Sequence, residues 1–503
     1  MILPRAAKAP HEFALDDGTR RRSWAELDDR VRRIAHWLRD DLDLAPASHV
    51  AVLMGNRVEA VEVVIGAFAA GLWITPVNRH LRPEEIAHVL ADSGARVVIA
   101  DAEHAGAARA AGATQVVVAG DELERELAAA SDAPLDPAGP AGGTMMYTGG
   151  TSGKPKGVRR ARPATLGAAI EAQRRAGAMI GLDGSGPHLV TGPLYHAAPL
   201  LFAIYDMLNG APMIVMPRWD EKQALEVLRE REVHHTHLVP TMFVRLLRLL
   251  DAERDAFRAP SLHLVLHGAA PIAPAVKQRM IEWWGPVLVE YWGGTESGVV
   301  TLVDSHEWLT HPGTVGRVLP HWEAFAVGDD GRRLPPGETG ALYSRHRDVP
   351  EPFVYHGDAE KTARAYLEPG VLTLGDVGWV DADGFVYLCD RASNMIISGG
   401  VNIYPAEIEQ VLAEHPAVAD VGVFGIPDDE WGETVKAAVQ LAPGCAATPA
   451  LEAEILAFCR AQLAGYKVPR SIDFERELPR HPTGKLLVRQ LRDRYWSGRA
   501  RRI

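Results

Sequence analysis

The first hundred residues alternate between two kinds of hydrophobic pattern. Short apolar runs suited to buried strands are followed by stretches in which apolar residues recur every three or four positions, as on one face of a helix. The capping-box spacing of Ser23 and Glu26 predicts a helix that begins there and continues to Leu38. The elements expected next are strands at 49–54, 72–77 and 96–100 and helices at 57–71 and 83–92. This alternation predicts an α/β fold with mostly parallel sheets covered by helices on both faces.

A second pattern begins near residue 390 and predicts a compact α+β unit. Its expected elements are helices at 405–414 and 451–463 and strands at 418–425 and 434–441. Cys459 shares the apolar side of the second helix, so we expect a core cysteine. A stretch rich in Pro, Gly and Ala at 132–143 predicts a loop before a new strand. We therefore divide the chain into a large domain of residues 1–390 and a small lid of residues 391–503, with a hinge at about 390–393.

The composition is that of a folded protein in water. Hydrophobic residues make up 47% of the 503 positions and charged residues 23%, and this length suits roughly two to four domains. Lys and Arg number 53 against 65 Asp and Glu, so the net charge is −12. A nucleic acid or an anionic membrane needs a cationic surface, so neither is an expected partner. The longest apolar run, 63–74, is too short for a membrane helix. Three scattered cysteines and no secretory pattern indicate a cytoplasmic protein.

The most specific pattern is a loop rich in glycine, hydroxyl and lysine residues, directly after a strand-like segment. Its candidate phosphate contacts are Thr148, Gly149, Gly150, Thr151, Ser152, Gly153, Lys154 and Lys156. Glycines let backbone N–H groups approach phosphate oxygens, and the hydroxyls and lysines add donors and positive charge. The loop differs from a Walker phosphate loop, because Gly149 and Gly153 enclose three residues rather than four and Pro155 follows the lysine.

This loop and six further motifs, in order along nearly the whole chain, resemble the adenylate-forming enzymes. That family includes acyl-CoA synthetases, firefly luciferases and the adenylation domains of peptide synthetases. The further motifs are LYHAAP at 194–199, EYWGGTE at 290–296, LGDVG at 374–378, DR at 390–391, ISGGVNIYP at 397–405 and PTGK at 482–485. The resemblance implies that ATP and an acid form an acyl-adenylate and pyrophosphate, and that a thiol then displaces AMP. Such chemistry concentrates negative charge and requires Mg²⁺, cationic side chains and oriented donors.

The resemblance also implies roles for individual residues. Lys485 would bridge carboxylate and phosphate oxygens during adenylation, Thr295 would donate to the α-phosphate, and Glu296 would hold Mg²⁺. His196 would lie where the nucleotide meets the acyl group. The remaining nucleotide contacts implied are Gly268, Ala269, Ala270, Glu290, Tyr291, Trp292, Gly293, Asp376 and Arg391. Among these, Trp292 would stack on adenine, while Asp376 and Arg391 would bind the ribose.

Family members rotate the small C-terminal domain between the two half-reactions. Here the rotation would withdraw Lys485 and bring Ser398, Gly399 and Gly400 towards the thiol tunnel. Small residues at that place would let a pantetheine arm pass close to the backbone. The hinge position is commonly Asp or Lys in the family and is Ser393 here. Serine tolerates the backbone change that a hinge needs, so rotation remains expected.

The predicted acyl pocket is mainly apolar, with several small side chains. Its expected lining is Tyr195, Ala197, Phe202, Val239, Met242, Phe243, His267 and Gly294. No Lys or Arg in this set could pair a second carboxylate, which favours a hydrophobic monocarboxylic acid of the fatty, aryl, or steroid or alicyclic kind. The stretch 373–402 most resembles bacterial fatty-acyl and bile- or steroid-acid CoA ligases. Residues 194–199 lack the aspartate that peptide synthetases place there for an ammonium group, which disfavours an amino acid.

Two acceptors fit the second half-reaction: coenzyme A, or the pantetheine arm of a separate carrier protein. Only 18 residues follow Lys485, too few for a fused carrier domain, and we favour coenzyme A. A non-catalytic acyl- or nucleotide-binding homologue is a further alternative. It is disfavoured because all five expected reactive positions, Thr295, Glu296, Asp376, Arg391 and Lys485, are retained. A homodimer is compatible with the sequence.

The histidine-rich run at 234–237 suggests a metal site, since imidazole is a common ligand. In a strand, however, His235 and His237 would share one face while His234 lies on the other. We therefore expect a pocket wall rather than a metal site.

Overall fold

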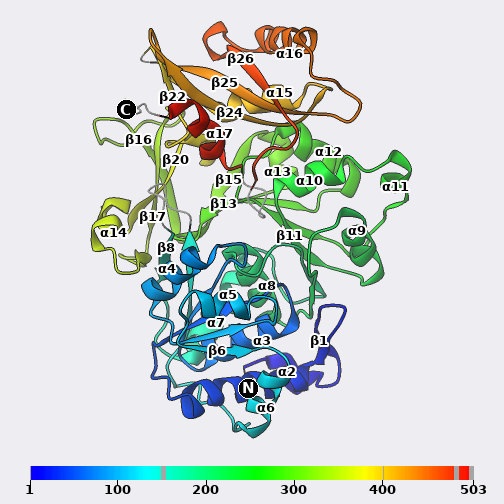
Figure 1. Cartoon of the computed structure of the whole chain (residues 1–503), viewed down its shortest axis with the longest axis vertical. Helices are drawn as coiled ribbons and strands as arrows, with labels where there is room; N and C mark the ends of the chain where they lie inside the picture. The colour runs from blue at the N-terminus through cyan, green and yellow to red at the C-terminus, as the bar shows by residue number, and fades with distance from the viewer. Residues whose placement is uncertain (1, 149–154, 400, 481–485, 498–503) are drawn as a thin grey trace.

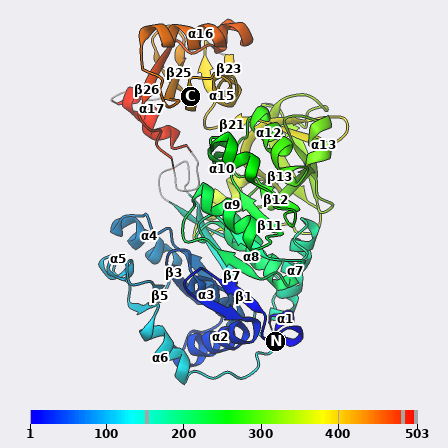
Figure 2. The same ribbon diagram turned by 90° about the vertical axis from the view of Figure 1, so that its right-hand side faces the viewer.

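The computed structural model describes residues 2–148, 155–399, 401–480 and 486–497. Its strands form three sheets of seven, fourteen and five strands. Figures 1 and 2 show the smallest sheet in a separate C-terminal unit above the rest of the chain. The predicted α/β fold with a large N-terminal domain and a small C-terminal domain is confirmed.

The seven-stranded sheet contains the alternating elements of the first hundred residues. In spatial order its strands are β18 (Phe353–Tyr355), β8 (Lys156–Arg160), β7 (Gly143–Thr148), β4 (Trp73–Pro76), β3 (His49–Leu53), β5 (Val97–Ala100) and β6 (Gln115–Val118). The strands from β7 through β4, β3 and β5 to β6 pair in parallel, as predicted. At the other edge, β8 pairs antiparallel with both β7 and β18.

The helices of this region include the three predicted at 23–38, 57–71 and 83–92, together with two further helices. They are α2 (Trp24–His36), α3 (Val58–Ala69), α4 (Pro83–Ser93), α5 (Ala105–Ala110) and α6 (Asp121–Ala129), with a π-helical turn at Trp37–Asp41. The capping box of α2 is confirmed: Ser23 accepts from the Glu26 N–H, and Glu26 accepts from the Ser23 N–H. Helix α3 is buried along its whole length, as expected of a helix that is apolar all round.

The fourteen-stranded sheet carries most of the predicted site. In spatial order its strands are β16 (Trp322–Val327), β17 (Gly340–His346), β20 (Val371–Val380), β21 (Phe385–Arg391), β15 (Thr314–Val318), β14 (Gly298–Asp304), β13 (Leu288–Gly294), β12 (Leu264–His267), β11 (His235–Leu238), β9 (His188–Val190), β10 (Met213–Val215), β1 (Phe13–Asp16) and β2 (Arg21–Ser23), and β19 (Tyr366–Glu368) pairs with β20. The helices in this part of the chain are α1 (Pro4–Lys8), α7 (Leu166–Met179), α8 (Ala197–Asn209), α9 (Glu221–Glu230), α10 (Pro240–Leu246), α11 (Asp251–Ala256), α12 (Pro274–Trp284), α13 (Ser305–Thr310) and α14 (Ala359–Ala365).

The prediction of mostly parallel sheets needs correction for half of this sheet. Neighbouring strands are parallel from β1 through β10, β9, β11 and β12 to β13. From β13 onward, through β14, β15, β21, β20 and β17 to β16, every neighbouring pair is antiparallel. The reason lies in the connections. Parallel neighbours need a crossover of a dozen residues or more, whereas β13 and β14 are joined by a tight turn between Gly294 and Gly298.

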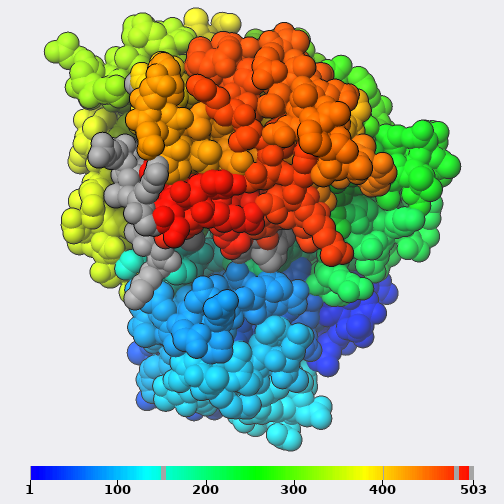
Figure 3. Space-filling model, turned by 45° about the horizontal axis from the view of Figure 1, so that its top comes forward, coloured from blue at the N-terminus to red at the C-terminus, as the bar shows by residue number. Residues whose placement is uncertain are grey.

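The C-terminal unit has the predicted α+β pattern. Its strands are β23 (Val401–Ile403), β22 (Ile396–Ser398), β25 (Gly432–Leu441), β24 (Val418–Asp428) and β26 (Ser471–Glu475), and its helices are α15 (Pro405–Ala413), α16 (Pro449–Gln462) and α17 (Val488–Trp496). Cys459 is buried in its core beside Ile408 and Leu412, as expected. Figure 3 shows α17 on the side of this unit that faces the N-terminal residues. Among the residues described, no helix is both long and apolar enough to cross a membrane.

Candidate active site

Three of the predicted nucleotide residues lie together at the junction of β13, β20 and β21. The Trp292 Nε1–H donates to Asp376 Oδ2 over 2.8 Å, and Arg391 Nη1 lies 3.2 Å from Asp376 Oδ1. Asp376 and Arg391 face each other across the β20–β21 hairpin, whose register pairs their Cα atoms. Asp376 therefore has its two oxygens oriented by two different partners. A carboxylate has about four acceptor positions, so ribose hydroxyls can still bind it.

The segment after β12 carries local backbone strain. Ala269 has a φ of 65°, in the left-handed region that residues with a Cβ seldom adopt. At the preceding Gly268, a Cβ would lie 2.6 Å from the Tyr291 carbonyl oxygen, so only glycine fits there. Gly268 to Ala270 thus follow the carboxyl end of a parallel strand in a constrained conformation. Ligands of open α/β sheets commonly bind at such strand ends.

The predicted phosphate loop is framed by the β7–β8 hairpin. Thr148 ends β7 and Lys156 begins β8, and the two residues are paired across it. Lys156 Nζ lies 3.6 Å from Asp358 Oδ2, near the start of α14. The six residues between them that were assigned to phosphate, Gly149, Gly150, Thr151, Ser152, Gly153 and Lys154, lie outside the described residues.

Thr295 and Glu296 occupy the tight turn between β13 and β14, and the Glu296 carboxylate fits a magnesium ion. Tyr355 Oη donates to Glu296 Oε1 over 2.9 Å. The second oxygen, Oε2, lies beside Gly294, where a Cβ would come within 3.3 Å of it. The same point lies 3.2 Å from Leu374 Cδ2, so the Leu374 side chain also packs on this side of Gly294. Mg²⁺ prefers hard oxygen ligands and usually binds one or two carboxylates together with substrate phosphates.

Glu290 and Tyr291 support the site from within the sheet. Glu290 Oε2 lies 2.7 Å from Lys277 Nζ of α12, and both side chains are buried. On the opposite face of β13, Tyr291 Oη lies 3.0 Å from His237 Nε2. Direct ATP contacts were predicted for both residues. In the structure the polar group of each side chain pairs with a protein side chain, because a buried charge or phenol needs a partner, and the ATP contacts stay predictions.

The predicted acyl-pocket residues are divided between the two faces of the large sheet. Phe202 of α8 packs edge-to-face against His237 and Tyr291, at 5.5 and 5.3 Å between ring centroids. Phe243 of α10 packs on His267 at 5.3 Å, on the other face. The division follows from strand geometry, since successive side chains point to opposite faces. Phe202 and Phe243 therefore pack on different faces of the sheet, and the predicted pocket lining stays a prediction.

The other lining residues lie near strand and helix ends. Tyr195 is buried, and its ring lies 4.5 Å from that of His196, the residue before α8. Burial raises the pKa of Tyr195 to about 12. Ala197 begins α8, Val239 precedes α10, and Met242 of α10 accepts a long hydrogen bond from Thr191. His196 therefore lies beside Tyr195, directly before the start of α8.

Two histidines of the run at 234–237, His235 and His237, belong to a buried hydrogen-bond network. His235 and His237 both face α8, as predicted for one side of a strand. Asp206 Oδ2 lies 2.7 Å from His235 Nδ1 and 2.9 Å from His188 Nδ1. Burial raises the pKa of Asp206, but the two histidines lower it by more, so the net shift is downward. No group of three or more His, Cys, Asp or Glu is placed to hold a metal ion in the described part of the chain.

The connection to the C-terminal unit is held by the Asp390 side chain. It accepts from the backbone N–H of Arg391 and from the Asn394 side chain through Oδ1, and from the Ala406 N–H through Oδ2. Burial raises the pKa of this carboxyl. The predicted hinge residue Ser393 lies within this loop. The large sheet ends at Arg391 and the next sheet begins at Ile396, so the chain changes sheet here.

The predicted thiol-tunnel segment is partly described. Ser398 ends β22, and Gly399 has a φ of 57°. A Cβ at Gly399 would lie 2.5 Å from Trp431 Cε3, so this position requires glycine on two grounds. Gly400 and the predicted catalytic Lys485 lie outside the described residues.

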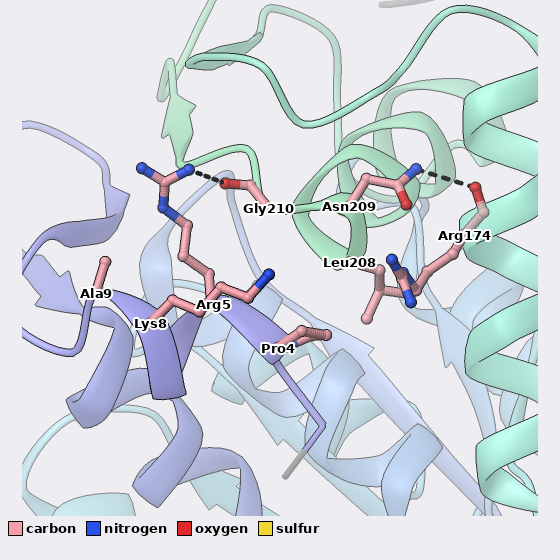
Figure 4. Close-up of a pocket in the computed structure, with 8 residues that line it drawn as sticks. All are labelled: Pro4, Arg5, Lys8, Ala9, Arg174, Leu208, Asn209 and Gly210. Carbon is pink, nitrogen blue, oxygen red and sulfur yellow. Dashed lines mark hydrogen bonds between the residues drawn. The ribbon is translucent and has the colours of Figure 1, made fainter.

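A separate cavity of about 270 Å³ lies between α1, α7 and α8. Figure 4 shows Arg5 across it, with Nη1 donating to the Gly210 carbonyl oxygen over 3.2 Å. None of the predicted site residues lines this cavity.

Sequence reasoning missed three partners of predicted site residues: Lys277, Tyr355 and Asp358. Lys277 could have been noticed as a lysine on the apolar side of a helix, three residues before Met280. Tyr355 carries no such local signal, because its partner Glu296 is 59 residues away.

Comparison with known proteins agrees with this geometry. The AMP-binding enzyme model matches residues 4–351, and the model of the AMP-binding enzyme C-terminal domain matches residues 407–485. A 2-succinylbenzoate–CoA ligase of Geobacillus kaustophilus is 35% identical over 505 residues, covering 98% of this chain and 96% of the relative. A fatty acid–[acyl-carrier-protein] ligase, ScoC of Streptomyces coeruleorubidus, is 32% identical over 96% of this chain and 93% of its own length.

A solved structure supports the same assignment. The o-succinylbenzoate CoA synthetase of Bacillus subtilis, in complex with its acyl-adenylate intermediate, superimposes with a TM-score of 0.83 at 27% identity and covers 97% of both chains. The chain therefore belongs to the AMP-binding enzyme family, as an acid–thiol ligase of the adenylate-forming type.

Proposed function

We propose that this protein is an ATP-dependent acid–CoA ligase acting on a hydrophobic monocarboxylic acid. A carboxylate oxygen attacks the α-phosphorus of ATP, and pyrophosphate leaves. The sulfur of coenzyme A then attacks the acyl carbon of the adenylate, and AMP leaves. The observation that carries this proposal is the convergence of Trp292, Asp376 and Arg391 beside the β13–β14 turn. Fatty, aryl and steroid or alicyclic acids all remain candidate substrates.

Each group at the site would have a separate task. Asp376 and Arg391 would hold the ribose, the hairpin loop after Thr148 would hold phosphates, and Glu296 would hold the Mg²⁺ that neutralises their charge. Lys485 would stabilise the charge that develops between carboxylate and phosphate. Residues 1–390 would form the nucleotide- and acid-binding domain and residues 391–503 the lid. The change of sheet between Arg391 and Ile396 supports this boundary.

The test is ATP turnover with Mg²⁺ and a panel of hydrophobic acids, with and without coenzyme A, resolving AMP from ADP. We expect AMP and pyrophosphate to rise with one class of acid and to need coenzyme A for multiple turnovers. Adenylate that forms but stalls with coenzyme A would instead favour a carrier-protein acceptor, as the name of ScoC suggests for that relative. If no acid supports AMP formation or pyrophosphate–ATP exchange, the alternative of a non-catalytic binder gains support.

Asp376→Asn is expected to raise the KM for ATP about tenfold or more, because hydrogen bonds to a charged group contribute about 1.5–3 kcal/mol. Asparagine keeps a carbonyl oxygen for the Trp292 N–H, so the change mainly removes charge. Asp383→Asn, in the turn of the same hairpin, is the matched control. Steady-state kinetics at saturating acid measure the effect. An unchanged KM for ATP would remove Asp376 from the nucleotide site.

A further inference from the structure

Glu296 receives a hydrogen bond from Tyr355, a residue outside every motif assigned above. Tyr355 is the last residue of β18, and its Oη lies 2.9 Å from Glu296 Oε1. Both side chains are partly buried, and Glu296 occupies the turn between β13 and β14 of the large sheet. Tyr355 thus joins two segments that belong to different sheets.

The phenol is held firmly in place. The Tyr355 ring packs edge-to-face on Phe353 at 5.2 Å, and Lys361 Nζ lies 4.1 Å from its centroid on the ring face. The Tyr355 N–H donates to Thr362 Oγ1 over 2.9 Å.

Strand β18 also contacts the β7–β8 hairpin that frames the predicted phosphate loop, called the phosphate hairpin below. β18 pairs antiparallel with β8, placing Tyr355 opposite Val158, and the His356 N–H donates to the Gly157 carbonyl oxygen over 2.8 Å. Three residues after Tyr355, Asp358 lies 3.6 Å from Lys156 Nζ. Residues 355–358 therefore contact both a predicted magnesium ligand and a predicted phosphate lysine.

We propose that Tyr355 is a positioning residue for Glu296, fixing the carboxylate relative to the phosphate hairpin so that Oε2 is presented to the magnesium of MgATP. The Tyr355 hydroxyl donates a hydrogen bond to Glu296 Oε1, and this bond restricts rotation of the carboxylate. Oε2 is the carboxylate oxygen on the Gly294 side, away from the hydrogen bond that Tyr355 makes to Oε1. This inference rests on the proposed function, since it assumes that Glu296 binds the metal.

Tyr355→Phe tests the inference, because it removes one hydroxyl and keeps the ring packing. The readout is ATP binding by isothermal titration calorimetry at a series of Mg²⁺ concentrations, with no acid present. We expect about tenfold more Mg²⁺ at half-maximal binding, the size expected for one hydrogen bond to a charged group. A purely structural role would instead lower the melting temperature without moving the Mg²⁺ dependence.

Tyr366→Phe is the matched control. Tyr366 also braces β18, donating from its phenol to the Phe353 carbonyl oxygen over 2.7 Å, but its hydroxyl does not contact Glu296. We expect this variant to keep the wild-type Mg²⁺ dependence. In a Glu296→Gln background, Tyr355→Phe should produce no further shift, since the two groups act together.

The outcomes separate the two proposals. Equal Mg²⁺ dependence in the wild type and Tyr355→Phe overturns the positioning role, while AMP formation in the acid panel leaves the ligase in place. An equal shift in both tyrosine variants also overturns it, because the effect would then arise from β18 as a whole. A wild type that binds no MgATP and forms no AMP overturns both.

Discussion

Lys485→Ala is expected to slow adenylation about 10²–10³-fold and to leave thioester formation from a supplied acyl-adenylate nearly unchanged. The magnitude is that of removing one group that stabilises charge in a transition state. In the first half-reaction a carboxylate oxygen approaches a phosphate, and both are negative, so a nearby cation lowers the barrier. In the second half-reaction a sulfur attacks an acyl carbon, and the domain rotation implied by the family would have withdrawn this lysine.

Two assays separate the half-reactions. Acid-dependent pyrophosphate–ATP exchange measures the first, and AMP release from prepared acyl-adenylate on addition of coenzyme A measures the second. Lys222→Ala is the control, since Lys222 is exposed on α9 and pairs with Glu253. If both half-reactions fell equally in Lys485→Ala, the assigned role would be wrong.

Lys277→Met is expected to lower the free energy of unfolding by about 3–5 kcal/mol, the usual effect of removing one partner from a buried ion pair. The Lys277 Nζ is fully buried, 2.7 Å from Glu290 Oε2 and 4.7 Å from the centroid of the Trp308 ring. Methionine fills similar space but leaves the Glu290 carboxylate without a counter-charge. Denaturant unfolding followed by circular dichroism measures the loss.

The loss should also depend on pH. Burial raises the pKa of Glu290, and without Lys277 nothing opposes this shift. Above the ordinary Glu pKa of about 4.3, the folded variant keeps a proton that the unfolded chain has already released, so its stability falls as pH rises. We expect a larger deficit at pH 8 than at pH 5. The double variant Lys277→Met/Glu290→Met should recover most of the stability, whereas Lys222→Met at the exposed Lys222–Glu253 pair should change little. A deficit independent of pH would mean that packing, not charge, accounts for the loss.

Local patterns predicted much of the fold and part of the site. The capping box of α2 and the predicted strands at 49–54, 72–77 and 96–100 depend on neighbouring residues, and both were confirmed. Asp376 and Arg391 meet because one hairpin pairs them across 15 positions, and their motifs are local. Trp292 lies on β13 and contacts Asp376, and the family resemblance had placed Trp292 at the nucleotide.

The parts of the fold and of the site that were not predicted depend on which strands, distant in sequence, become neighbours in a sheet. No periodicity in the sequence indicates that β18 pairs with β8, or that Tyr355 therefore reaches Glu296. The arrangement of the predicted acyl-pocket residues was not foreseen for a related reason. Phe202, Phe243 and His267 were combined by motif proximity, but the register of the sheet sends them to different faces. Residues that are adjacent in motifs need not be adjacent across a sheet.

The pairing of β18 with β8 has a consequence for synthesis on the ribosome. Val158 lies opposite Tyr355, so the edge of the seven-stranded sheet stays open until nearly 200 further residues have been made. Those residues include most of the fourteen-stranded sheet, as the colour gradient of Figure 1 makes visible. Contacts so distant in sequence form slowly, and an open strand edge can pair with another chain in the meantime. We therefore expect the phosphate hairpin to be the last part of the N-terminal half to acquire its final structure, and truncations before residue 353 to aggregate rather than fold.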